Sequence, residues 1–252
     1  MNVSSLTSEG LSRPTRKIKN DARQEQIARA ALAVVAQQGL IHLNIGTVAI
    51  KVGVAPSAIY RYFPSKDAML KSVLELIAKL LRENVAVVCQ TTSDPLEQLH
   101  LLMRRHVHLA HNNAGLPRIL FSEQIFAGDS GRRRLVEQTF HGYLGEIAGI
   151  IRGGQRQGGI RPTVPADVAA VMFLGLIQPA VILQLISEGS FDAARHAERA
   201  WKLFREMLQV PGSPSPAAPP IKRPPDKLRK NLQPALNQFK HENRPTKPAS
   251  GA

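Results

Sequence analysis

The side chains best placed for chemistry with another molecule lie close together between residues 57 and 61. Ser57, Ala58, Tyr60 and Arg61 fall on or near one face of a short helical stretch, and Ile59 among them is apolar. If this stretch enters the major groove of DNA, the Arg61 guanidinium can bond to guanine O6 and N7 together, with a discrimination of about 1–3 kcal/mol. The Ala58 methyl can touch a thymine methyl. Arg61 is therefore our candidate for sequence readout.

A glycine turn between two short helices positions this face. Asn44 caps a predicted helix that runs through Val52, Gly53 ends it, and Pro56 opens the next helix, which runs through Tyr62. Gly53 can adopt the left-handed conformation that such a tight turn needs. The apolar anchors of the unit are Val48, Val52, Val54 and Ile59. This spacing predicts a helix-turn-helix.

Two longer helices enclose that unit. Asp21 caps a first helix that Gly39 ends, and its apolar residues fall on one face. Pro64 and Ser65 stop the third helix and cap a fourth, which runs from Lys66 towards Cys89. Residues 21–66 are thus predicted to form a DNA-binding domain.

Residues 43–70 resemble the TetR family of bacterial transcriptional regulators. The family pattern runs from a helix-capping Thr through Ile-Ala, Ala-Gly-Val-Ser, Tyr-x-Tyr/His-Phe and Ser-Lys-x-x-Leu. The matching residues are Ala49, Gly53, Val54, Tyr60, Tyr62, Phe63, Ser65, Lys66 and Leu70. With the first helix included, the specific resemblance covers residues 22 to about 75, and the later helices match the family in number and character.

The resemblance implies how the DNA backbone is held. Tyr60 and Tyr62 are implied to contact phosphates through their hydroxyls, and Lys66 through an ammonium at a helix N-terminus. A further phosphate is expected at the first turn of the second helix, beside Asn44, Gly46 and Thr47. Such contacts fix the register of the protein on DNA and carry no sequence information.

Four residues depart from the family pattern. Asn44 stands where Thr is usual, Val48 replaces Ile, Val52 replaces a small Ala, and Ala55 replaces the Ser or Thr that caps the reading helix. Losing that cap costs about 1 kcal/mol of local helix stability. We expect the third helix to order fully only on DNA, unless Pro56 at its first turn compensates.

Charge and composition favour a polyanionic partner but do not identify which kind. The chain carries 33 Lys and Arg against 19 Asp and Glu, a formal net charge of +14, which favours nucleic acid or anionic lipid. Residues 211–252 are rich in Pro and contribute +6 of that charge, so we expect a disordered basic tail. Residues 1–20 read as a flexible basic arm.

Other functional classes find little support. The lone Cys89 excludes an intrachain disulfide, and the four histidines between residues 100 and 111 have poor metal spacing. No catalytic motif of the hydrolase, metalloprotease or Walker type occurs. The first twenty residues lack an apolar core, and polar residues, Gly175 and Pro179 interrupt the run 169–186. We predict a cytoplasmic protein that is not an enzyme, with no metal, no cofactor and no membrane partner.

Residues 67–210 are predicted to form a helical domain that binds a small molecule. The resemblance places an effector among helices near 95–112, 117–127 and 132–157. The candidate ligand residues are Met103, His106, Val107, Phe121, Gln124, Phe140 and Tyr143. At single positions, a plain hydrophobic core is the better explanation of the apolar members.

The last two predicted helices, 166–187 and 191–208, are more apolar than one covered face requires. Two such pairs can form a four-helix dimer interface. The candidate contact residues are Phe173, Leu174, Ile177, Val181, Trp201 and Phe204.

The predicted architecture is all-α, with a basic arm (1–20), a helix-turn-helix domain (21–66), a ligand-binding and dimerisation domain (67–210) and a tail (211–252). The leading hypothesis is a homodimeric repressor that binds a palindromic operator and is released by a small molecule. A ligand-independent nucleoid or division factor of the same fold, and a helical module that binds protein or RNA, stay open as alternatives.

Overall fold

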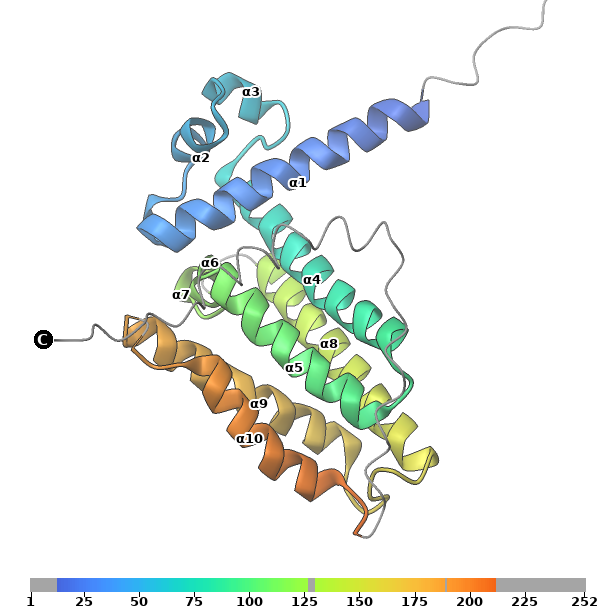
Figure 1. The fold of residues 1–252 in the computed structure, drawn as a ribbon. Coiled ribbons are helices and arrows are strands. Elements are labelled where there is room, and N and C mark those ends of the chain that lie inside the picture. The colour runs from blue at the N-terminus through green and yellow to red at the C-terminus, as the bar shows by residue number, and fades with distance from the viewer. Residues whose placement is uncertain (1–12, 127–129, 189, 212–252) are drawn as a thin grey trace, which may run out of the picture. The chain divides into compact units, whose positions relative to one another are not determined.

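A computed structural model describes residues 13–126, 130–188 and 190–211, and the described residues form ten α-helices (Figure 1). The all-α prediction is confirmed for this part of the chain. The N-terminal elements are α1 (Arg13–Gln38), the 3₁₀ turn η1 (Leu40–His42), α2 (Ile45–Val52), α3 (Pro56–Tyr60) and α4 (Lys66–Thr91). The later helices are α5 (Pro95–Asn112), α6 (Gly115–Leu120), α7 (Glu123–Phe126), α8 (Ser130–Arg156), α9 (Ala166–Ile186) and α10 (Ala193–Leu208).

Helix α1 joins the two halves of this fold. It packs against α2, α4 and α6, and its apolar face is fully buried at Ile27, Ala31 and Val35. Figure 1 shows α1 crossing the start of α4, next to α2 and α3. The N-terminal unit therefore rests on the larger bundle through α1 and the start of α4.

Helix α5 runs through the middle of the C-terminal bundle, where it contacts α4, α8, α9 and α10. Leu99, Leu102 and Met103 on α5 are fully buried. Backbone pairing joins the segment after α8 to the end of α10. The Arg161 amide donates to the Leu208 carbonyl at 2.8 Å, and Ile160 forms an antiparallel bridge with Gln209.

Three boundaries differ from the sequence predictions. Helix α1 begins at Arg13, so residues 13–20 are helical where a flexible arm was expected, and residues 1–12 lie outside the described residues. The helix expected near 117–127 is two short helices, α6 and α7. Helix α3 ends at Tyr60, two residues before the predicted end. The expected disordered tail lies outside the described residues from residue 212 onward.

The residues predicted to make the dimer contacts lie inside the single chain. All six side chains named for it are buried within one protomer: Phe173, Leu174, Ile177, Val181, Trp201 and Phe204. They form the inner faces of α9 and α10, where the Phe173 and Phe204 rings lie 6.0 Å apart. A side chain that already fills the core of its own chain cannot also be the surface that meets a partner.

An apolar surface does exist on the opposite side of α9. We define the outer face of α9 by its exposed apolar residues, Val168, Val171, Met172, Ile182, Leu183 and Ile186. Their helical spacing puts them in one stripe along the helix. By length and composition alone α9 also resembles a membrane span, but a single such helix is weak support for a membrane protein.

Candidate DNA-binding surface and ligand cavity

The turn between α2 and α3 has the predicted backbone geometry. Gly53 adopts the left-handed conformation with φ of 76° and ψ of 38°. Its amide donates to the Ala49 carbonyl at 2.9 Å, and the Val54 amide donates to the same carbonyl at 3.0 Å. Ile59 and Phe63 are buried beneath α3 and anchor it. The helix-turn-helix prediction is confirmed as a fold.

The start of α2 is closed by a reciprocal cap. The Thr47 amide donates to Asn44 Oδ1 at 2.9 Å, and the Asn44 amide donates to Thr47 Oγ1 at 3.1 Å. The cap at Asn44 is confirmed, but the cap occupies Asn44 Oδ1 and the Thr47 amide. A phosphate at this helix start would therefore meet the first-turn amides of Ile45 and Gly46, which have no partner within the helix.

The reading surface around α3 is open to solvent. Ser57, Tyr60 and Arg61 are exposed, while Ala58 and Tyr62 are half-buried. Arg61 is the C-cap of α3 and Tyr62 lies beyond the helix, because α3 ends at Tyr60. Tyr60 is 55% exposed, a large fraction for an aromatic ring.

The third helix lacks a side-chain cap, as the sequence predicts. Ala55 at the N-cap position offers no hydrogen-bonding side chain, and Pro56 occupies the first turn. The helix has five residues, closed by a bond of 2.9 Å from the Ala58 amide to the Ala55 carbonyl. Its proposed ordering on DNA stays a prediction.

The start of α4 lies beside the reading surface and is tied to the bundle. Ser65 caps α4 by accepting from the Ala68 amide at 3.1 Å, and Lys66 is the first helical residue. The next residue, Asp67, pairs with Arg132 of α8. The Arg132 guanidinium also donates to the Gln124 carbonyl of α7 at 3.4 Å. One arginine therefore links α4, α7 and α8.

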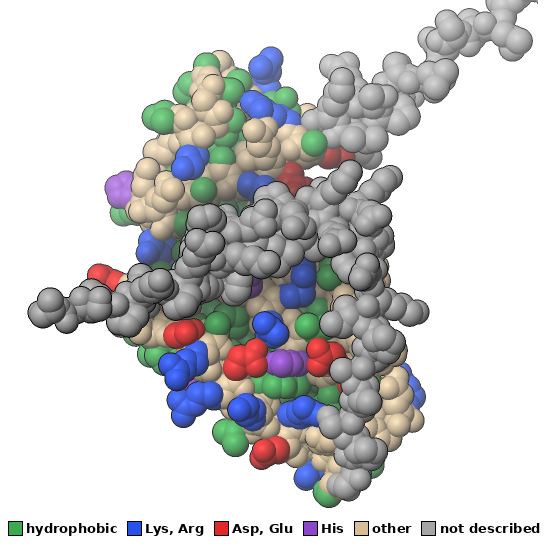
Figure 2. All heavy atoms as spheres, viewed as in Figure 1, with side chains coloured by type: hydrophobic (Ala, Val, Ile, Leu, Met, Phe, Trp, Pro, Cys, Tyr) green, Lys and Arg blue, Asp and Glu red, His purple; other side chains and the backbone are tan. Residues whose placement is uncertain are grey.

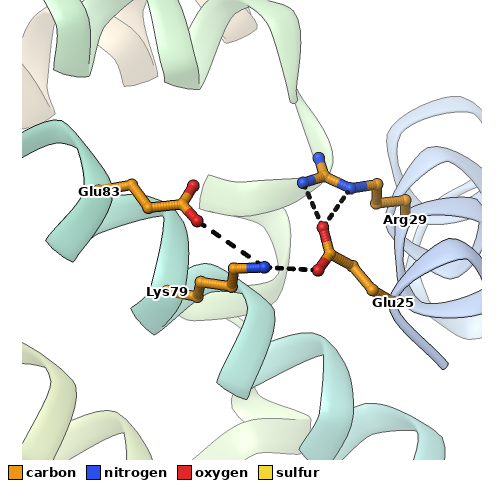
Figure 3. A network of polar contacts seen from close by, with 4 residues as sticks. All are labelled: Glu25, Arg29, Lys79 and Glu83. Carbon is orange, nitrogen blue, oxygen red and sulfur yellow. Dashed lines mark hydrogen bonds and ion pairs between the residues drawn. The ribbon is translucent and has the colours of Figure 1, made fainter. Parts of the chain in front are cut away.

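A second polar link joins α1 to α4 (Figure 3). Lys79 of α4 contacts Glu25 of α1 at 2.6 Å and Glu83 at 3.7 Å. Arg29 holds the other Glu25 oxygen at 2.7 Å. Hydrogen bonds from Lys79 and Arg29 lower the pKa of Glu25, and its carboxylate raises the pKa of Lys79.

Helix α6 meets α1 through a glycine. A Cβ atom at Gly115 would overlap the carbonyl oxygen of Leu32 and crowd the Ala36 amide. The backbones of α1 and α6 therefore lie so close here that a Cβ atom has no room, and only glycine fits at this position.

A small cavity lies between α4, α5, α6, α8 and α9. We call it the central cavity and define it by its lining, Ile77, Leu81, His106, Leu109, Ala110, Leu116, Pro117, Leu120, Phe121, Phe140, Tyr143, Gln178 and Val181. Its free volume is about 30 Å³, which is room for one or two water molecules.

A buried hydrogen bond forms the polar part of its wall. His106 Nδ1 lies 2.9 Å from the Tyr143 hydroxyl, and both side chains are buried. Burial lowers the pKa of His106 to about 4, so its imidazole is neutral at physiological pH. Burial also raises the pKa of Tyr143, with a smaller contribution from the Glu146 carboxylate, and the phenol stays protonated.

The structure brings together only part of the predicted ligand set. His106, Phe121, Phe140 and Tyr143 line the central cavity. Met103 and Val107 are buried but are not among the lining residues, and Gln124 is exposed on α7.

The α4 and α9 residues of the lining were not predicted from the sequence. Val181 was assigned to the dimer and lines this cavity instead. Gln178 carried a usable signal, since it is a polar residue inside an apolar helix.

Family comparisons match both halves of the chain. Residues 27–73 match the family described as bacterial regulatory proteins, tetR family. Residues 92–208 match the family described as tetracyclin repressor-like, C-terminal domain.

Among curated proteins, the chain is similar to the nucleoid occlusion factor SlmA of Vibrio vulnificus (strain YJ016). The two are 23% identical over 191 residues, which cover 76% of this chain and 97% of the relative. SlmA of Vibrio cholerae is also 23% identical over 191 residues, with the same coverage.

Solved structures share the fold. A regulator from Saccharomonospora viridis in complex with choline has a TM-score of 0.66 at 21% identity, over 75% of this chain and 98% of that one. FadR from Bacillus subtilis in complex with stearoyl-CoA has a TM-score of 0.62 at 22% identity, over 73% and 99%. KstR2 of Mycobacterium tuberculosis has a TM-score of 0.58 at 16% identity, over 75% and 95%.

Proposed function

The chain belongs to the TetR family of bacterial regulatory proteins and is a DNA-binding transcriptional regulator. From that premise we propose that it is a dimeric repressor that binds a palindromic operator and leaves it when a small molecule binds. One observation carries this proposal. Helix α4 begins at Lys66 beside the reading surface, and the same helix supplies Ile77 and Leu81 to the wall of the central cavity. A ligand in the cavity and a phosphate at Lys66 would therefore act on one rigid element.

We propose that Arg61 reads a base edge while Tyr60, Tyr62 and Lys66 hold phosphates. The exposure of Tyr60 and Arg61 supports this assignment, because nothing in the protein core explains either side chain. Ser57 and Ala58 would face the groove on the preceding turn. At the start of α2 we propose that the Ile45 and Gly46 amides hold a phosphate, with Asn44 and Thr47 fixing them.

The proposed dimer forms through the outer face of α9. Figure 2 shows Lys and Arg side chains gathered over α10, whose exposed surface carries Arg195, Arg199 and Lys202. The four Lys and Arg residues of α10 outnumber Glu198 and Glu206, so two such faces would meet with like net charge across a two-fold axis. The apolar stripe of α9 can meet its own copy without that cost, so we centre the interface there, with the exposed Leu203 of α10 at its edge.

Release follows from geometry. Two reading helices must meet major grooves about 34–36 Å apart, so a small tilt of α4 in each subunit misaligns them. A ligand that needs more than the free volume of the central cavity would push on Ile77 and Leu81 and favour the tilted state. Such a regulator acts in the cytoplasm, where the chromosome lies.

Selection of DNA by the purified full chain, followed by binding titrations, tests the proposal. We expect one short palindrome to bind at least a thousandfold more tightly than random duplex. Lys66→Ala should weaken both and lower the salt slope by about one. Lys71→Ala is the matched control, because Lys71 is an exposed lysine on the same helix. Equal affinity for every duplex would overturn the repressor assignment.

A second function has a specific observation in its favour. The relatives named as nucleoid occlusion factors are covered over 97% of their length. A factor of that kind would bind many chromosomal sites and ignore small molecules. Many recovered sites far from promoters, together with no ligand that changes affinity, would favour this alternative.

A further inference from the structure

We infer that the central cavity takes an uncharged, mainly apolar effector that carries one small hydrogen-bonding group, such as a ketone or an alcohol. This inference rests on the proposed function and names the chemistry of its ligand. It follows from the lining of the cavity, from the hydrogen-bonding capacity of one buried pair and from the charge that surrounds them.

The lining is apolar apart from three neutral side chains. The described residues that line the cavity include no Lys, Arg, Asp or Glu. Their polar groups are the imidazole of His106, the phenol of Tyr143 and the amide of Gln178. A ligand with a net charge would lose its hydration here without gaining a counter-ion, which is strongly unfavourable.

The His106–Tyr143 pair offers a fixed hydrogen-bonding capacity. If Tyr143 donates to Nδ1, the imidazole keeps its Nε2–H as a donor and the phenol oxygen keeps a lone pair. If Nδ1–H donates instead, the phenol keeps its O–H and Nε2 keeps its lone pair. In either tautomer the pair has one donor and at least one acceptor left. A carbonyl can use the donor, and an alcohol can use both.

The surroundings disfavour an anion in particular. Glu146 lies one helical turn after Tyr143 on α8, and its carboxylate acts on the Tyr143 phenol. Its Oε2 atom is buried without a hydrogen-bond partner among the described residues. A carboxylate or phosphate beside the His106–Tyr143 pair would face this acidic group across a poorly solvated interior. Glu146, whose own charge partner is Arg82, therefore disfavours an anionic headgroup. The absence of Asp and Glu from the lining disfavours a cationic one.

The wall of the cavity can yield at two places. Phe121 stands at its edge with 51% of its surface exposed. On α9 the lining residues Gln178 and Val181 flank Pro179, whose ring removes the hydrogen bond that would run back to Gly175. A ligand larger than the free volume can be admitted where the helix is already weakened.

A set of probes that share a ten-carbon chain tests the inference on the full chain. We would titrate 2-decanone, 1-decanol, decane, decanoate and decyltrimethylammonium by calorimetry, and follow operator release in parallel. We expect 2-decanone and 1-decanol to bind at least tenfold more tightly than either charged probe, and severalfold more tightly than decane. Decanoate should bind more tightly as the pH falls and the acid becomes neutral.

Two variants separate the hydrogen bond from the apolar contact. Tyr143→Phe removes only the hydroxyl, so the advantage of 2-decanone over decane should fall severalfold while decane binding is unchanged. Thr139→Val is the control, because it removes a hydroxyl from the same helix at a residue outside the lining, and it should leave the ligand order unaltered.

Each outcome decides between the two proposals. Equal or tighter binding of a charged probe, or no binding by any probe, would overturn the neutral-effector inference, and the repressor proposal would stand on its operator data. Binding of 2-decanone without operator release would support the inference and count against ligand-released repression.

Discussion

The helix-turn-helix exposes its candidate functional groups to solvent, whereas the C-terminal bundle buries its own. Around α3, the candidate contacts point into solvent on a backbone held by a cap, a left-handed glycine and two buried anchors. In the bundle, the candidate ligand groups point inward, and their pKa values are moved by burial. The first region can bind phosphate groups with side chains that are solvated in the free protein. The second can bind an apolar molecule in an interior that excludes water. Substitutions should therefore act through charge in one region and through packing in the other.

The largest expected effect separates the inner face of α9 from its outer face. Phe173→Ala should lower the free energy of unfolding by about 3–5 kcal/mol, because it empties a fully buried site. Met172→Ala, one residue away and 46% exposed, should leave protomer stability nearly unchanged and weaken self-association. Chemical denaturation and sedimentation measure the two quantities. Similar losses of stability in both variants would contradict the assignment of the two faces.

The next effect concerns pH. Folding lowers the pKa of His106 from 6.5 to about 4, so the unfolded chain binds the proton more tightly. Stability should therefore fall as pH drops below about 6.5 and level off near 4, with a total loss of about 3 kcal/mol. The difference in stability between wild type and His106→Phe, measured across this range, isolates the contribution.

Gly115→Ala probes the contact between the two regions. The added methyl would overlap the Leu32 carbonyl, and relief by backbone movement should cost about 1–3 kcal/mol. Because α6 also lines the central cavity, operator affinity should fall as well. Gly142→Ala is the matched control, since its Cβ has open space around it on α8. That change should be neutral or stabilise the helix by up to about 1 kcal/mol.

The smallest effect belongs to the polar link between α1 and α4. Glu25 and Lys79 are partly exposed, so a double-mutant cycle with Glu25→Gln and Lys79→Met should give a coupling of about 0.2–1 kcal/mol. Added salt should shrink that coupling. A coupling that is large and indifferent to salt would show that the two domains are clamped together more firmly than the exposure of these groups allows.

Sequence reasoning succeeds where the determinants are local. Three residues act on groups within a few positions of themselves, as their types predict: Asn44 caps α2, Gly53 ends it in a left-handed conformation, and Ser65 caps α4. The pairing of Asp67 with Arg132 spans 65 residues and that of His106 with Tyr143 spans 37, so both depend on how whole helices pack.

Helix α9 illustrates the limit most clearly. It is apolar nearly all round, so its sequence period does not distinguish the face that enters the core from the face left exposed. Phe173 was predicted to meet a partner for this reason, and it lies in the core of its own chain. At Ala55, in contrast, the sequence is sufficient, because an alanine side chain cannot cap α3.

Cys89 gives the protein a built-in reporter. It is the single cysteine of the chain, it is exposed, and it lies two residues before the end of α4. A nitroxide attached there would place one spin label on each α4 of a dimer, and the distance between the labels would follow the tilt of that helix directly. Desolvation and the nearby Glu146 raise the pKa of the thiol, so labelling should proceed faster in mildly alkaline buffer.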